Sequence, residues 1–235
     1  MPEPDRRLAL VTGASAGIGD ALARRFAARG HDVVLVARRA DRLEALGRVL
    51  THEHGIRAFP MPADLATPAG PRGLLADLAE RGLRPDVLVA NAGFGAWGRL
   101  HELDAERLAA MVRLNVLALA DLSRRLLPVM LERRRGGILT VASTAAFQPG
   151  PFMTHYFATK AFVLSFSEGL AAELRGTGVR CCCLCPGPTA TEFGRAAEME
   201  EASIFTGPLM SADRVADLAM RGWDRGRPVI VTGTL

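Results

Sequence analysis

Short apolar runs alternate with helical stretches along almost the whole chain, and this alternation restricts the fold more than any other feature. The apolar runs are continuous in Val, Leu and Ala, which is typical of strands that are buried on both faces. Such alternation predicts an α/β fold with a doubly wound parallel sheet (a Rossmann fold) of about seven strands. The expected strands are residues 7–11, 32–37, 56–61, 86–90, 137–142, 179–184 and 228–231, and the expected helices are residues 18–29, 40–54, 68–81, 105–134, 155–175 and 212–221.

Length and composition are those of one domain. The chain has 235 residues, of which 49% are hydrophobic, and no linker, repeat or low-complexity tract interrupts it. We therefore expect a single domain over residues 1–235, with a flexible tail at residues 1–6. Because no apolar run reaches the roughly 18 residues of a membrane span, we also expect a soluble, cytoplasmic protein.

A glycine-rich turn follows the first expected strand and opens the first expected helix. Its glycines are Gly13, Gly17 and Gly19, in the spacing GxxxGxG. A turn in this setting brings backbone N–H groups and a helix N-terminus against a phosphate. Gly13 would permit the tight turn, Gly17 the approach of a pyrophosphate, and Gly19 the close packing of helix on strand. The alternative is an ordinary strand-to-helix connection.

The chain contains one tyrosine and one lysine, and they stand four residues apart as Tyr156 and Lys160. At this spacing two helical side chains share one face. An ammonium beside a phenol favours the phenolate and lowers the phenol pKa from about 10, which suits a general acid/base. The alternative is an amphipathic pair on an exposed helix.

Four motifs together carry a resemblance to a known family. They are the TGxxxGxG turn, the run Asn91-Ala92-Gly93, a serine thirteen residues before Tyr156, and Pro186-Gly187. In this order they resemble the short-chain dehydrogenase/reductase family, from about Arg7 to Val231. The resemblance implies an oxidoreductase that transfers a hydride between a nicotinamide cofactor and a carbonyl or alcohol substrate.

The resemblance also implies a catalytic set of Asn115, Ser143, Tyr156 and Lys160. Tyr156 would exchange a proton with the substrate oxygen, and Ser143 would hydrogen-bond that oxygen. Lys160 would lower the tyrosine pKa and hold the cofactor ribose. Asn115 would hold a water that relays protons to Lys160. Taken singly, Ser143 is an ordinary strand-end serine and Asn115 an ordinary helix residue.

Cofactor choice is predicted from the end of the second expected strand. The position that is acidic in NAD-binding relatives is Ala37 here, and Arg38 follows it, which favours the 2′-phosphate of NADP(H). The alternative is that Arg38 and Arg39 simply begin a polar loop. The resemblance places the cofactor against Gly13, Ser15, Gly17, Ile18, Gly19, Arg38, Asp64, Asn91, Ala92, Gly93, Tyr156, Lys160, Pro186, Gly187 and Thr189.

The expected substrate is a small apolar ketone or aldehyde, or the matching alcohol. No charged residue is obviously placed to hold a substrate carboxylate. Residues 190–209 have the length and mixed character of a lid over the substrate, although a plain surface loop is the alternative. Apolar residues near the expected pocket mouth, which core packing would explain equally well, are Phe94, Trp97, Phe147, Phe152, Met153 and Phe193.

Two features that could indicate other partners have simpler explanations. Cys181, Cys182, Cys183 and Cys185 lie on one expected strand, where neighbours point to opposite faces, so they cannot converge on one metal ion. We expect reduced core thiols and no metal. The net charge is +4, but arginines are interspersed with acids, and residues 133–135 end a helix, where cations complement its dipole. We therefore expect neither nucleic acid nor membrane as a partner.

Two further expectations concern assembly and alternative functions. The helices at residues 105–134 and 155–175 carry more apolar surface than one sheet face needs, which predicts a homodimer or homotetramer. A regulatory protein that binds NADP without turnover is the alternative on the same fold. A redox-neutral relative, such as an epimerase, would need a longer substrate domain.

Overall fold

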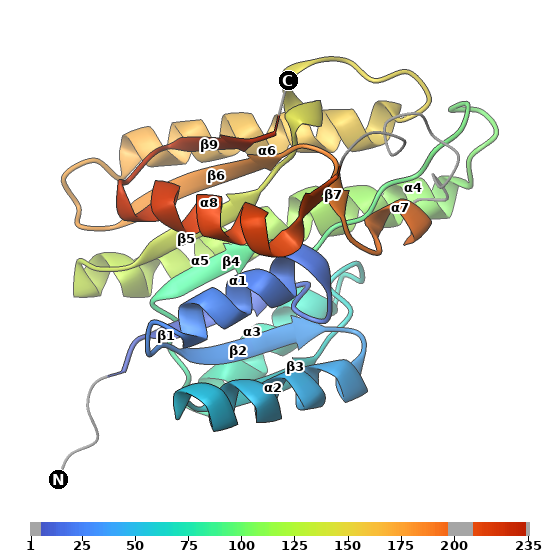
Figure 1. The fold of residues 1–235 in the computed structure, drawn as a ribbon. Coiled ribbons are helices and arrows are strands. Elements are labelled where there is room, and N and C mark those ends of the chain that lie inside the picture. The colour runs from blue at the N-terminus through green and yellow to red at the C-terminus, as the bar shows by residue number, and fades with distance from the viewer. Residues whose placement is uncertain (1–5, 197–208, 234–235) are drawn as a thin grey trace, which may run out of the picture.

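A seven-stranded parallel sheet forms the centre of the protein (Figure 1). The computed structural model describes residues 6–196 and 209–233. The strand order is β3-β2-β1-β4-β5-β6-β9, so the chain winds outward in one direction and then in the other. This confirms the predicted doubly wound α/β fold. The strands are β1 (Leu8–Thr12), β2 (Asp32–Ala37), β3 (Ala58–Pro62), β4 (Val87–Ala90), β5 (Gly137–Val141), β6 (Arg180–Pro186) and β9 (Val229–Thr232).

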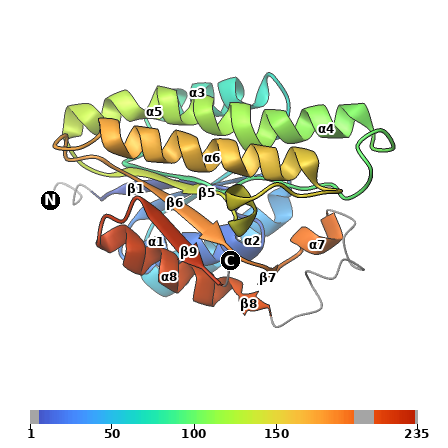
Figure 2. The ribbon, with the colours of Figure 1, turned by 90° about the horizontal axis from the view of Figure 1, so that it is seen from above.

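Helices cover both faces of the sheet in two layers (Figure 2). One layer contains α1 (Gly17–Ala27), α2 (Ala40–His54) and α8 (Ala212–Asp224), and the other contains α3 (Gly70–Glu80), α4 (Ala105–Val112), α5 (Leu119–Arg133) and α6 (Thr154–Glu173). Every residue of β1 and β5 is buried, because each strand lies between these layers. Two large apolar clusters therefore lie one on each side of the sheet, and a third, smaller one surrounds Tyr156.

The helix predicted at residues 105–134 is divided by a π-helical segment, η1 (Arg113–Ala118). The expected long helix thus becomes α4, η1 and α5, in one continuous helical span. A π-turn adds a residue to one helical turn and is frequent at functional sites. Periodicity along a sequence does not reveal it, because the apolar spacing stays close to helical on both sides. The predicted bounds of β2 and α2 are the observed ones, and the other predicted boundaries differ from the observed ones by at most three residues.

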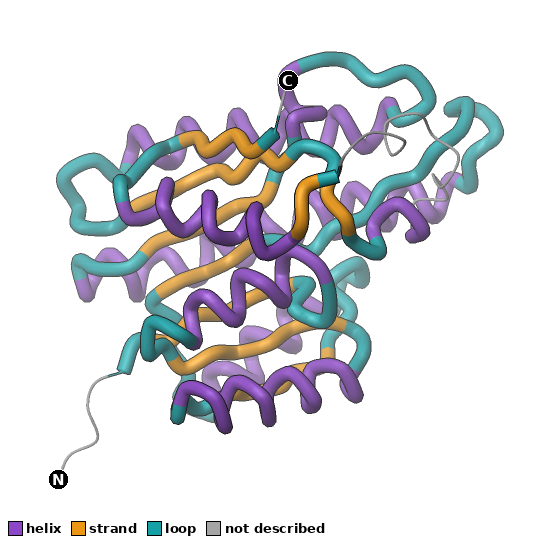
Figure 3. Tube along the Cα trace, viewed as in Figure 1, coloured by secondary structure: helices purple, strands orange, loops and turns teal. Residues whose placement is uncertain are grey.

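Several short elements near the carboxyl ends of the strands were not predicted. They are the 3-10 turn η2 (Thr144–Phe147), the strands β7 (Thr189–Ala190) and β8 (Met210–Ser211), and the short helix α7 (Phe193–Ala196). β7 and β8 pair in parallel beside the start of α8 (Figure 3). Of the expected lid at residues 190–209, residues 197–208 lie outside the described residues, as do residues 1–5 of the expected tail.

The cysteines of β6 divide between the two faces of the sheet. Cys182 belongs to one apolar cluster, whereas Cys181, Cys183 and Cys185 belong to the other. All four are buried free thiols. Within residues 6–196 and 209–233, no group of three or more His, Cys, Asp or Glu side chains is arranged to hold a metal ion.

The arginines at the end of α5 have a more specific role than the predicted helix-dipole contact. Arg133 and Arg135 donate to the buried carboxylate of Asp86, at 2.9 and 3.1 Å. Asp86 also accepts from the backbone N–H of Leu8. Of the three arginines at residues 133–135, two therefore neutralise a buried charge at the amino end of the sheet.

Over the described part of the chain, no helix is both long and apolar enough to cross a bilayer.

Candidate active site

A cleft of about 840 Å³ opens at the carboxyl ends of the strands, where the strand order reverses between β1 and β4. Doubly wound sheets bind ligands at this point. Two of the predicted site residues, Gly19 and Asn115, lie behind its wall. The predicted residues that line the cleft are Gly13, Ser15, Gly17, Ile18, Arg38, Asp64, Asn91, Ala92, Gly93, Ser143, Tyr156, Lys160, Pro186, Gly187 and Thr189.

The glycine-rich turn needs glycine for two separate reasons. Gly13 and Gly17 have φ angles of +68° and +58°, a region that disfavours side chains. Gly19 has an ordinary helical backbone, but a β-carbon there would collide with the carbonyl group of Gly13. The turn thus folds back tightly on the first turn of α1, and the helix N-terminus faces the cleft.

Asn91 fastens this turn to β4. Its Nδ2 donates to the carbonyl oxygen of Thr12 at 3.0 Å, and the Thr12 hydroxyl accepts from the backbone N–H groups of Asn91 and Ala92, each at 3.0 Å. The Thr12 hydroxyl in turn donates to the carbonyl oxygen of Val89. These bonds fix the base of the cleft between the two central strands.

Tyr156 lies on α6 with only 9% of its surface exposed. Its ring packs beside those of Phe157 and Phe193, with the Phe193 centroid 5.3 Å away. Burial raises the pKa of Tyr156 to about 12, and a hydrogen bond with the Ser143 side chain opposes this shift. In the free protein this pKa is thus raised, whereas the sequence predicted a lowered one, because loss of hydration outweighs the hydrogen bond. The phenol is protonated at neutral pH.

Ser143 follows β5 and faces Tyr156 across the cleft. Its hydroxyl caps η2 by accepting from the backbone N–H of Ala145 at 3.1 Å, and it donates to the carbonyl oxygen of Pro186 at 3.4 Å. The hydroxyl is therefore held by the loops after β5 and β6. Parallel strands end at the same edge of the sheet, so this placement follows from the fold.

Lys160 is 5% exposed and is fixed by the sheet. Its Nζ donates to the carbonyl oxygen of Val141 at 2.8 Å and lies 5.7 Å from the centroid of the Tyr156 ring. Burial lowers the pKa of Lys160 to about 8. The amine therefore stays largely protonated at neutral pH, close to the phenol.

Asn115 is 2% exposed and lies in the π-helical segment. Its Oδ1 accepts from the backbone N–H of Phe94 at 3.1 Å, and its Nδ2 donates to the carbonyl oxygen of Phe94 and to the hydroxyl of Thr159. It thereby joins the loop after β4 to α6. A β-carbon at Gly93 would lie 2.9 Å from Asn115 Oδ1 and 3.6 Å from Lys160 Nζ, so this glycine permits the close packing.

The opposite end of the cleft is polar and lies near the carboxyl end of β2. Arg38 is exposed there and makes no hydrogen bond or ion pair with any described residue. Asp64 is also exposed, and its side chain accepts from the backbone N–H of Ala66. Thr189 lies deeper, where its hydroxyl donates to the carbonyl oxygen of Gly187 at 2.8 Å.

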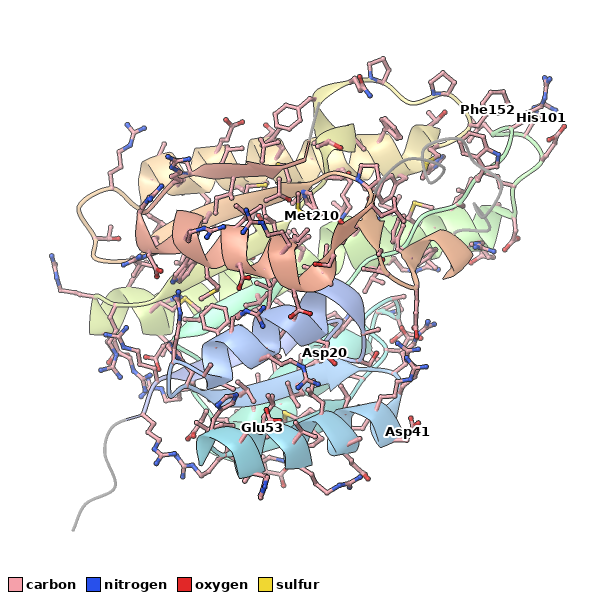
Figure 4. The ribbon with its side chains drawn as sticks, in the orientation of Figure 1. Asp20, Asp41, Glu53, His101, Phe152 and Met210 are labelled. Atoms are coloured by element: carbon pink, nitrogen blue, oxygen red, sulfur yellow. The ribbon has the colours of Figure 1, made fainter. Side chains whose placement is uncertain are left out.

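The part of the cleft near Tyr156 is apolar. Every charged residue that lines the cleft, apart from Lys160, lies toward the β2 end. Trp97 and Phe152 were expected at the pocket mouth but do not line the cleft. Their rings stack on each other, with the centroids 5.5 Å apart. Phe152 is labelled in Figure 4. The lining residues that pack in one apolar cluster with Tyr156 are Phe94, Ala145, Met153, Phe157 and Phe193.

Residues 7–202 match the family model described as short chain dehydrogenase. The chain belongs to the short-chain dehydrogenase/reductase family. A solved structure of a short-chain dehydrogenase from Sphingobium yanoikuyae in complex with NADPH is similar over 96% of this chain and 87% of that one, with a TM-score of 0.89 and 37% identity. The bulky-bulky ketone specific alcohol dehydrogenase from Comamonas testosteroni covers 98% of this chain and 88% of its own, with a TM-score of 0.86 and 31% identity.

Curated members of the short-chain dehydrogenase/reductase family are somewhat longer than this chain. The NADP-dependent 3-hydroxy acid dehydrogenase of Salmonella typhi is 38% identical over 188 residues, which cover 79% of this chain and 74% of the relative. A short chain dehydrogenase of Pseudocercospora fijiensis is 38% identical over 191 residues, and this chain spans 61% of its length.

Three residues of the present chain, at or beside the cleft, were not predicted as parts of the site: Arg39, Arg42 and Glu192. Arg39 donates to the hydroxyl of Ser15 through Nε at 3.2 Å and Nη2 at 2.9 Å, and both Arg39 and Arg42 pair with Glu192. Arg39 and Arg42 stand three positions apart at the start of α2, a spacing that predicts a shared helix face. Nothing in the sequence indicates that Glu192, which follows β7, meets them.

Proposed function

We propose that this protein is an NADP(H)-dependent oxidoreductase that interconverts apolar ketones or aldehydes and the matching alcohols. One observation carries the proposal. Tyr156, Ser143 and Lys160 converge at the apolar end of a cleft whose other end carries the glycine-rich turn and Arg38. A candidate proton donor and the groups that would bind a dinucleotide thus line the same cleft.

The residues of the cleft fit a dinucleotide phosphate. Gly13 and Gly17 expose backbone at the N-terminus of α1, where N–H groups and the helix dipole favour a pyrophosphate. Arg38 carries an unpaired cation, within the described residues, at the position where a ribose 2′-phosphate is expected. The neighbouring position Ala37 offers no carboxylate that would repel it. Thr189 would contact the carboxamide of the nicotinamide.

Proton transfer would be the task of Tyr156. The bound nicotinamide supplies or accepts a hydride at the substrate carbon. Because the phenol is protonated at neutral pH, it would donate its proton to the carbonyl oxygen during reduction. In the reverse direction the phenolate, after release of its proton to solvent, would accept the alcohol proton. The Ser143 hydroxyl would hydrogen-bond the same oxygen and hold the charge that develops on it.

Lys160 would support both reactants from the wall of the cleft. Its ammonium is held at the end of β5 by Val141, close to the Tyr156 ring. There it would stabilise a phenolate that forms in turnover and bind the ribose hydroxyls. The polar atoms of the Asn115 side chain already have protein partners, so we propose an anchoring role for it. The relay water predicted at Asn115 stays a prediction.

The lining near Tyr156 favours a substrate without a carboxylate. A hydroxy acid would bring a charge that needs a cationic partner, and the described lining there has no free cation. Phe94, Phe147 and Phe193 instead offer apolar surface to an alkyl or aryl group. We therefore favour apolar ketones and aldehydes over 3-hydroxy acids.

A spectroscopic assay tests the proposal. Purified protein and NADPH would be mixed with alkyl and aryl ketones, aldehydes and 3-oxo acids, and the nicotinamide absorbance would be followed. We expect turnover with the apolar carbonyl compounds and much slower turnover with the acids. Binding of NADPH without turnover of any compound would favour a regulatory protein. Faster turnover of the acids would refute the apolar substrate class.

A further inference from the structure

The carboxylate of Glu192 forms ion pairs with two arginines beside the polar end of the cleft. Glu192 Oε2 lies 2.7 Å from Arg39 Nη1, and Glu192 Oε1 lies 2.6 Å from Arg42 Nη1. Both oxygens are thus used, one for each guanidinium. Arg42, and then Arg39, hold the pKa of Glu192 below its usual range, so the carboxylate is ionised at neutral pH.

Arg39 lines the cofactor end of the cleft, whereas Arg42 lies outside the lining and pairs with Glu192, which lines it. Arg39 also donates to the Ser15 hydroxyl within the glycine-rich turn, and it follows Arg38 directly. Asp41, labelled in Figure 4, marks the first turn of α2 at this end of the sheet. A dianionic phosphate placed here would accept hydrogen bonds from the same guanidinium N–H groups that now pair with Glu192.

The segment that carries Glu192 also reaches the other end of the cleft. A β-carbon on Gly17 would lie 2.9 Å from Thr191 Cγ2, and Phe193 packs 5.3 Å from Tyr156. Residues 191–193 therefore lie along the cleft from the glycine-rich turn to the candidate proton donor.

We propose that Glu192 competes with the 2′-phosphate of NADP(H) for Arg39 and Arg42, and thereby limits the preference for NADP(H) over NAD(H). The inference rests on the proposed function. The ion pair must open before the phosphate can use these donors, whereas a ligand without the 2′-phosphate leaves it closed. The opposite reading is that Glu192 orients the arginines for the phosphate. The two readings predict effects of opposite sign.

The substitution Glu192→Gln tests this competition. Titration calorimetry would compare NADPH with NADH, and adenosine 2′,5′-bisphosphate with adenosine 5′-monophosphate. Because each exposed ion pair contributes little, we expect binding of the two 2′-phosphorylated ligands to become about threefold to tenfold tighter. Binding of the other two ligands should stay within about twofold.

Two matched variants separate competition from a general charge effect. Asp224→Asn removes the same charge from a pair with Arg29, which joins α1 to α8 and does not line the cleft, so it should not change NADPH binding. In a protein that already carries Arg39→Gln and Arg42→Gln, Glu192→Gln should have no effect. Equal tightening in the Asp224 variant would overturn the inference.

The outcomes also separate this inference from the proposed function. If the wild-type protein prefers NADPH but Glu192→Gln weakens or does not change its binding, the inference alone is wrong. If the wild-type protein binds neither NADPH nor adenosine 2′,5′-bisphosphate, both are wrong. Tightening that is confined to the 2′-phosphorylated ligands would support competition by Glu192.

Discussion

The ammonium of Lys160 donates a 2.8 Å hydrogen bond to the carbonyl oxygen of Val141, at the end of β5. The lysine is thus fixed by the central sheet, and the phenol of Tyr156 stands beside it, with its ring centroid 5.7 Å away. The sheet therefore holds the cation in place before any ligand binds, so catalysis does not require the loss of side-chain entropy that ordering a free lysine would cost.

Replacing the phenol alone should separate binding from turnover. In Tyr156→Phe we expect NADPH affinity to stay nearly unchanged, because the ring still fills its place among Phe157 and Phe193. Turnover should fall by at least the roughly 10²-fold that loss of a general acid typically causes. Calorimetry and the absorbance assay would measure the two effects. Wild-type turnover in this variant would exclude Tyr156 as the proton donor.

Lys160→Met should change how stability depends on pH. The pKa of Lys160 is about 8 in the folded protein and near 10.5 when unfolded, so the unfolded chain binds more protons between these values. Wild-type stability should therefore rise relative to the variant as pH increases from about 8 to 10.5, by up to the order of 3 kcal/mol. Below about pH 8 the difference should be constant. Denaturant unfolding at several pH values would measure it.

The chain offers a clean reference for that experiment. Lys160 is its only lysine and Tyr156 its only tyrosine. Tyr156→Phe should keep the rise between pH 8 and 10.5, because the lysine is retained. A stability difference between wild type and Lys160→Met that does not vary with pH would contradict the lowered pKa.

Arg38→Asp should shift the cofactor preference from NADP(H) toward NAD(H). A carboxylate at this exposed position would repel the 2′-phosphate and could accept from the ribose hydroxyl instead. Calorimetry with both reduced cofactors would measure the ratio of affinities. The reading of Ala37 and Arg38 is wrong if the wild-type protein already binds NADH more tightly than NADPH.

We expect a homodimer or homotetramer that uses the outer surface of α6 and of the helical span formed by α4, η1 and α5. Much of the apolar surface counted from the sequence is buried within one chain, as Met111, Leu122 and Val163 show. Leu117 and Phe162 nevertheless remain 58% and 40% exposed. Light scattering at micromolar concentration should give the mass of an oligomer, and Phe162→Glu should lower it. A monomeric mass for the wild-type protein would refute the expectation.

The sequence by itself determined the fold and which strand ends meet at the cleft. Continuous apolar strands alternating with helices allow little besides a doubly wound parallel sheet, and such a sheet brings the ends of β1, β4, β5 and β6 together. The glycine-rich turn, Ser143 and Tyr156 follow those strands or lie close to their ends, so their meeting could be predicted from their order along the chain.

Only the tertiary structure decided the electrostatics and the long-range contacts. The sequence places Lys160 beside Tyr156, but the direction of the phenol pKa depends on how completely packing excludes water, and burial wins. The pairing of Glu192 with Arg39 joins residues 153 positions apart through exposed side chains that carry no periodic signal. Asn115, in the π-helical segment, likewise bonds to Phe94 and Thr159, which local propensity cannot specify.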